Sequence, residues 1–198
     1  MPFHQKLAQC CVDNITTNEI IGVITVILTI VMYVLYIKDT TSGKIKPHPF
    51  SWFLWLLITA TIFLAQLSDG AGPGAWMNGA VTFFNVIVFS LSIKNGIDVI
   101  KKIDLIVLGL AIISIILWLV TSTPLFSVIL LTIALNLAFI PTLRKAYHQP
   151  FEESMHLFTF GFFRHGLTIL AMDNLSIITT LSPAVLVLDN LIVAAFIL

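Results

Sequence analysis

Two ionisable side chains stand inside apolar stretches of the sequence, where charged groups are rare. Arg164 and Asp189 each lie within a run long enough to cross a bilayer. An ionised group at the centre of a membrane helix costs about 3 kcal/mol on insertion scales, so each charge needs an offsetting role. In one interpretation both line a cavity, where they bind a polar solute or Asp189 carries a proton. In the other they form a structural ion pair between neighbouring helices.

Amide and imidazole side chains extend the set of residues that could bind a solute. Asn85 and Asn190 lie within apolar runs, where they could bind a solute or join helices by hydrogen bonds worth roughly 0.6 to 2 kcal/mol each. Asn78 and Asn136 have the same two interpretations. His165 is either a proton relay, because histidine titrates near neutral pH, or a packed, hydrogen-bonded side chain.

A further apolar run carries aromatic and hydroxyl groups at helical spacing. Trp55 and Thr59 are four residues apart and therefore share a helix face with Trp52 and Gln66 nearby. Trp55 could stack on a bound solute, whereas Trp52 is also explained as an anchor at the membrane interface. We therefore add Trp55 and Thr59 to the candidate substrate-binding residues.

The composition excludes several classes of function. Of 198 residues, 58% are hydrophobic and 10% are charged, whereas soluble domains carry roughly 25% charged residues. The formal net charge is zero, so no field would gather nucleic acid. Neither a metal-binding pattern such as His-Glu-x-x-His nor a Ser or Cys with a recognisable base is present. We expect no enzyme, no cofactor and no bound metal.

Apolar runs of the length needed to cross a bilayer, about 20 residues, repeat along the chain. Backbone polar groups must be paired in lipid, so these runs should be helices. We predict an all-α polytopic membrane protein, with a polar segment at 1–19 and turns at 70–74 and 121–124, the first of them flexible and external. The seven predicted spans are residues 20–37, 50–67, 76–93, 104–120, 125–142, 156–172 and 176–198.

The loops differ in charge, and this predicts how the chain is oriented. Basic residues gather after the first, third and fifth spans, while the alternate loops have none. Because basic loops stay in the cytoplasm, we expect the N-terminus outside and the C-terminus inside. The basic residues of these loops are Lys38, Lys44, Lys46, Lys94, Lys101, Lys102, Arg144 and Lys145.

Short motifs recur in the same order in the two halves of the chain. Leu28-Thr29-Ile30 returns as Leu131-Thr132-Ile133, Pro49-Phe50 returns as Pro150-Phe151, and Asn85 has its counterpart in Asn190. Ser114 is the only polar side chain between Leu105 and Val120 in the fourth span, which suits a linker facing lipid. We predict two parallel three-helix repeats, 20–93 and 123–198, joined by a linker at 94–122.

A three-plus-one-plus-three plan with one asparagine in the third helix of each repeat resembles the SWEET/PQ-loop transporter family. The resemblance covers about residues 20–198 and implies that Asn85 and Asn190 contact the solute. The family's Pro-Gln signature is replaced by Pro141-Thr142 in the second repeat and by Tyr36-Ile37-Lys38 in the first. Some proton-coupled members use an aspartate in the last helix, where this chain has Asp189.

The resemblance implies a transporter that moves a small polar solute by alternating access around a site at the bilayer midplane. A sugar, nucleoside, amino acid or vitamin-like solute would fit such a site, and Asp189 or His165 would couple protons. The alternative is a seven-helix ligand receptor on the plan of the KDEL receptor, with no transport. The expected partners are a small-molecule solute and the lipid bilayer, with no nucleic acid; a homo-oligomer remains open.

Overall fold

The computed structural model describes residues 15–44, 47–95, 100, 102–148 and 155–197. In these ranges it contains seven α-helices, one short 3-10 helix and no strand, which confirms the prediction of an all-α protein. The elements are α2 (Thr17–Thr41), α3 (Pro49–Ser68), η1 (Gly72–Ala75), α4 (Trp76–Asn95), α5 (Lys102–Thr121), α6 (Leu125–His148), α7 (Met155–Leu170) and α8 (Ile177–Ile197).

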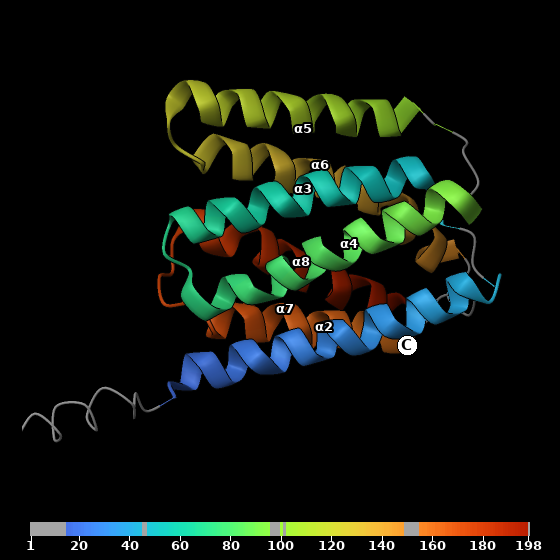
Figure 1. Cartoon of the computed structure of the whole chain (residues 1–198), viewed down its shortest axis with the longest axis horizontal. Coiled ribbons are helices and arrows are strands. Elements are labelled where there is room, and N and C mark those ends of the chain that lie inside the picture. The colour runs from blue at the N-terminus through green and yellow to red at the C-terminus, as the bar shows by residue number, and fades with distance from the viewer. Residues whose placement is uncertain (1–14, 45–46, 96–99, 101, 149–154, 198) are drawn as a thin grey trace, which may run out of the picture.

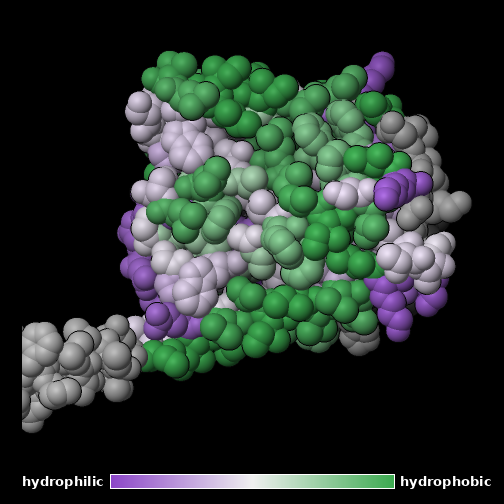
Figure 2. All heavy atoms as spheres, in the orientation of Figure 1, coloured by the Kyte–Doolittle hydropathy of each residue, from purple (hydrophilic) through white to green (hydrophobic). Residues whose placement is uncertain are grey.

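Five of the described helices are long and apolar enough to cross a membrane: α2, α3, α4 with η1, α5 and α8. Within α6, the apolar stretch Leu125–Leu137 is shorter. Large apolar side chains are exposed on the outer helix faces, and Leu119 is 77% exposed. Figure 2 shows hydrophobic atoms over most of this face and hydrophilic atoms at its two ends. This surface suits lipid, as expected of a membrane-embedded protein.

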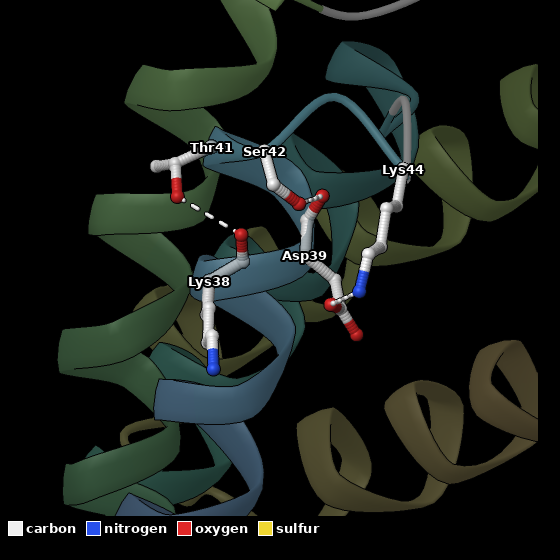
Figure 3. A network of polar contacts seen from close by, with 5 residues as sticks. All are labelled: Lys38, Asp39, Thr41, Ser42 and Lys44. Atoms are coloured by element: carbon white, nitrogen blue, oxygen red, sulfur yellow. Dashed lines mark hydrogen bonds and ion pairs between the residues drawn. The ribbon is translucent and has the colours of Figure 1, made fainter.

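Two helices end four residues or more beyond the predicted spans. The prediction ended the first span at residue 37 because hydropathy falls at Lys38, but α2 continues to Thr41. A capping box of Thr16 and Glu19 begins the helix, and Thr41 Oγ1 donates to the Lys38 carbonyl at 3.0 Å at its end (Figure 3). Similarly, α6 continues past residue 142 to His148. Hydropathy finds the part of a helix that contacts lipid, whereas polar residues can extend the helix beyond it.

The glycine-rich segment at 70–74 is closely packed, in contrast to the flexible turn that we predicted. Residues 72–75 form η1, whose Pro73, Gly74 and Ala75 are buried. A Cβ atom at Gly74 would lie 2.3 Å from Cγ of Met172, so only glycine allows the approach of the α7–α8 connection. Close packing explains this glycine better than flexibility does.

The helices lie side by side and alternate in direction. In Figure 1, α2, α4, α6 and α8 run from left to right, and α3, α5 and α7 run back. α4 contacts both α2 and α3, which together form the N-terminal group. α8 likewise contacts both α6 and α7, which form the C-terminal group. The groups meet where α2 contacts α7 and α3 contacts α6, whereas α5 packs at the edge on α3 and α6.

Candidate binding cavity

A cavity of about 470 Å³ lies between the two groups of helices. Its lining comes from α2, α3 and α4 on one side and from α6, α7 and α8 on the other. Its volume is within the range of small-molecule sites, roughly 300–1,000 Å³. The residues that line it are Met32, Tyr33, Trp52, Trp55, Thr59, Ile62, Asn78, Val81, Asn85, Leu135, Phe139, Phe158, Gly161, Arg164, His165, Ser182, Pro183, Leu186 and Asn190.

Most of the candidate residues from the sequence line this cavity, and two do not. Those at the cavity are Asn85, Asn190, Arg164, Trp55, Thr59, Asn78 and His165. Asn136 is half-buried and donates to the backbone carbonyl of Thr132 at 2.9 Å. Asp189 is only 6% exposed but is absent from the lining, and its Oδ2 has no hydrogen-bond partner among the described residues.

On the N-terminal side, Asn85 is held by hydrogen bonds from two other helices. Tyr33 Oη of α2 donates to Asn85 Oδ1 at 2.6 Å, and Asn85 Nδ2 donates to Thr59 Oγ1 of α3 at 3.1 Å. The Tyr33 ring stacks on Phe84, with centroids 5.1 Å apart. Asn85 is 1% exposed. Its amide therefore has a fixed orientation, because its oxygen and its nitrogen each already make a hydrogen bond.

A second polar layer joins three helices beside the cavity. Asn78 Nδ2 donates to Gln66 Oε1 at 2.8 Å, and Gln66 Nε2 donates to the Thr179 backbone carbonyl at 2.9 Å. These bonds join α4 to α3 and α3 to α8. Asn78 thus does what the structural interpretation of the asparagines expected, although it also lines the cavity.

On the C-terminal side, Asn190 has no comparable bonds to other helices. Its Nδ2 donates to the Leu186 carbonyl of its own helix at 2.6 Å, which is its one hydrogen bond among the described residues. The side chain packs on Gly161 of α7, where a Cβ atom would lie 2.2 Å from Asn190 Oδ1. Glycine at 161 therefore makes room for this amide.

Arg164 lines the cavity without an acidic partner among the described residues. Its Nη2 lies 3.4 Å from His165 Nε2, and its Nη1 lies 3.9 Å from the Met32 sulfur. Arg164 Nε and His165 Nδ1 are buried atoms with no hydrogen-bond partner in the described part of the chain. Nor does an ion pair join Arg164 to Asp189, so the structural ion pair that the sequence left open is not formed.

Hydrogen bonds join the two groups at the end of the bundle where α2 begins and α3 ends, which lies on the left in Figure 1. Asn18 Nδ2 of α2 donates to Asp173 Oδ1 at 2.8 Å, and Asn174 Nδ2 donates to the Asp69 carbonyl at 2.7 Å. Ser176 Oγ also donates to Asp69 Oδ2. We call these five residues the polar latch. It joins the start of α2 and the end of α3 to the α7–α8 connection.

Sequence reasoning missed several cavity residues because their types carry no functional signal. Phe139, Phe158 and Leu186 are ordinary apolar residues of membrane helices, and only packing places them at the cavity. Gly161 had a weak signal, since glycine inside a helix often marks a close approach. Comparisons with protein-family models, with curated proteins and with solved structures found no match to this chain.

Proposed function

We propose that the protein is a membrane transporter that moves a small solute by alternating access around the cavity. The observation that carries this proposal is that both groups of helices line one cavity near the middle of the helices. A site between two bodies becomes accessible from either side of a membrane when the bodies tilt relative to each other. A solute bound there would cross without passing through lipid.

The two groups are proposed to be parallel repeats in a three-plus-one-plus-three arrangement like that of the SWEET/PQ-loop family. Two observations support this. The third helix of each group packs against the other two, and the contact of α2 with α7 has its counterpart in that of α6 with α3. Corresponding helices also run in the same direction, as expected for parallel repeats (Figure 1). In this plan α6 and α7 also cross the membrane, and α5 is the linker.

The polar latch is the proposed closed gate of this conformation. It binds the two groups together at the left end, where Asp173 N also donates to the Ala71 carbonyl at 3.1 Å. Four basic residues lie at or just beyond helix ends on the opposite side: Lys38, Lys44, Lys94 and Lys102. By the positive-inside rule the latch faces outward. The cavity is then closed toward the outside and opens when the latch breaks.

Uptake into proteoliposomes tests this function. Purified protein is reconstituted and assayed with labelled sugars, nucleosides, amino acids and carboxylates, with empty liposomes as the control. Transport predicts saturable uptake of at least one class. A solute that binds the purified protein but never enters the liposomes contradicts transport and favours the receptor alternative.

A matched pair of glycine variants tests the latch. Gly72 and Gly43 both have positive φ, +58° and +76°, so alanine costs about 1–3 kcal/mol in backbone strain at either position. Only at Gly72 would the Cβ also meet Asp173 Oδ2, at 1.9 Å, whereas nothing lies within 4 Å at Gly43. G72A should displace the Asp173 carboxylate and so disturb the polar latch. We therefore expect G72A to lower the uptake rate at least fivefold and G43A to leave it unchanged. Equal rates for the two variants would exclude the latch from gating.

A further inference from the structure

We propose that the solute is an organic monocarboxylate with an apolar body, bound through its carboxylate by Arg164. This inference rests on the proposed function, since it names the solute class of the same cavity. It begins with the one cation that the described residues place in the cavity lining.

The guanidinium of Arg164 is a charge without a countercharge. A charge removed from water is stable only when it is paired and its hydrogen-bonding groups are satisfied. Among the described residues, its hydrogen-bond contacts are a thioether sulfur and the His165 ring, and its buried Nε has no hydrogen-bond partner. Methionine sulfur is a weak acceptor. The free N–H groups therefore favour an anion from outside the chain.

The geometry of the group favours a carboxylate. Guanidinium presents two parallel N–H donors that match the two oxygens of a carboxylate. A phosphate ester carries a second negative charge and is usually bound by several cations or by a helix N-terminus. Among the described lining residues only Arg164 carries a fixed positive charge, and it lies in the interior of α7. One cation matches one carboxylate.

The lining also argues against an amino acid. A zwitterionic solute brings an ammonium group, which needs a carboxylate or several acceptors in return. No Asp or Glu is among the lining residues, and Asp189, although it precedes the lining residue Asn190 directly in the chain, is not at the cavity. A free carboxylic acid without an amino group is therefore the better match.

The rest of the cavity favours an apolar body. Aromatic and aliphatic side chains from both groups face the same space, among them Trp55 of α3, Phe139 of α6 and Phe158 of α7. Such a wall stabilises an apolar group by about 25 cal/mol for each Å² removed from water. A sugar, with hydroxyl groups on every side, would leave many of them without partners here.

Binding to the purified protein in a neutral detergent tests the inference. The probes are 3-phenylpropanoate, hexanoate and lactate, each with its neutral amide, together with phenylalanine. Trp52 and Trp55 line the cavity, so tryptophan fluorescence reports occupancy. We expect at least one of the acids to bind at least tenfold more tightly than its amide, and phenylalanine to bind more weakly than 3-phenylpropanoate. If no acid is preferred over its amide, the inference is wrong.

Arg164 variants assign the effect to this side chain. R164Q should lose at least tenfold in affinity for the preferred acid and keep its affinity for the amide, and R164K should lose less because it keeps the charge. K94Q, which removes an exposed cation at the end of α4, should change neither affinity. Undiminished acid binding by R164Q or R164K overturns the proposal. If R164Q does not fold, R164K and the acid–amide comparison still test whether Arg164 binds the carboxylate.

Uptake separates this inference from the proposed function. Saturable uptake of a sugar with no preference for carboxylates overturns the solute class and leaves transport intact. Tight, Arg164-dependent binding of a carboxylate that never enters proteoliposomes overturns transport and leaves the solute class intact.

Discussion

The two walls of the cavity carry matching asparagines in different states. On the N-terminal wall, Asn85 is bonded to Tyr33 of α2 and Thr59 of α3, so its amide links three helices. On the C-terminal wall, Asn190 donates only to its own helix among the described residues and rests on Gly161. The sequence repeats the residue, but the structure does not repeat its bonds.

This difference indicates a division of roles between the walls. Buried amides that join helices stabilise a membrane protein, whereas polar groups whose hydrogen-bonding capacity is not used remain available to a ligand. Two buried polar atoms of lining residues lack hydrogen-bond partners among the described residues, Arg164 Nε and His165 Nδ1, and both lie on the C-terminal wall. We infer that the N-terminal wall is the rigid frame and the C-terminal wall recognises the solute.

The largest effect that would test this division is expected at Gly161. Alanine there would place a methyl group 2.2 Å from Asn190 Oδ1, forcing the amide aside at a cost of about 1–3 kcal/mol. Gly166, on the same helix, has nothing within 4 Å of an added Cβ. We expect G161A to lower the melting temperature and abolish binding of the preferred carboxylate in the fluorescence titration.

The matched variant G166A should retain binding and melt at the same or a higher temperature, because alanine favours helix by about 1 kcal/mol over glycine. Equal losses in G161A and G166A would trace the effect to helix backbone changes in general. The packing of Asn190 would then have no special role.

Smaller effects are expected from removing each asparagine, mainly on affinity for Asn190 and mainly on stability for Asn85. N190A should lower affinity about tenfold, which is ~1.4 kcal/mol, and change the melting temperature little. N85A leaves the Tyr33 hydroxyl without its partner and removes one hydrogen bond of Thr59, so it should cost roughly 1–3 kcal/mol of stability and change affinity less. Thermal melting and fluorescence titration give the melting temperature and the affinity of each variant. Matching losses of affinity in N190A and N85A would make the two walls equivalent.

The fold was largely predictable because lipid imposes a simple rule on the sequence. Every predicted span has its helix, since an apolar run of membrane length must pair its own backbone groups. The rule does not apply outside lipid, which is why the ends of α2 and α6 were missed. It also says nothing of packing, so the buried 3-10 turn at Gly72–Ala75 was predicted to be flexible.

The candidate site was predictable only as far as polarity could guide the choice. A polar side chain in an apolar helix avoids lipid, and this placed Asn85, Arg164 and Thr59 at the cavity. Polarity could not choose between Asp189 and Asn190, because adjacent residues point about 100° apart on a helix and the rotation of the helix is set by its packing. The hydrogen-bond partners of each polar side chain could not be predicted either, since they depend on contacts between distant segments.

The smallest effect is expected from Tyr33, which lines the cavity but belongs to the frame. Y33F removes the hydrogen bond to Asn85 Oδ1 and keeps the ring that stacks on Phe84, so it should cost about 0.5–1.5 kcal/mol of stability. Affinity for the carboxylate should stay within twofold of the unmodified protein. The control is Y147F, at a tyrosine that is 65% exposed near the end of α6. A tenfold loss of affinity in Y33F alone would mean that its hydroxyl binds the solute, and recognition would then extend to the N-terminal wall.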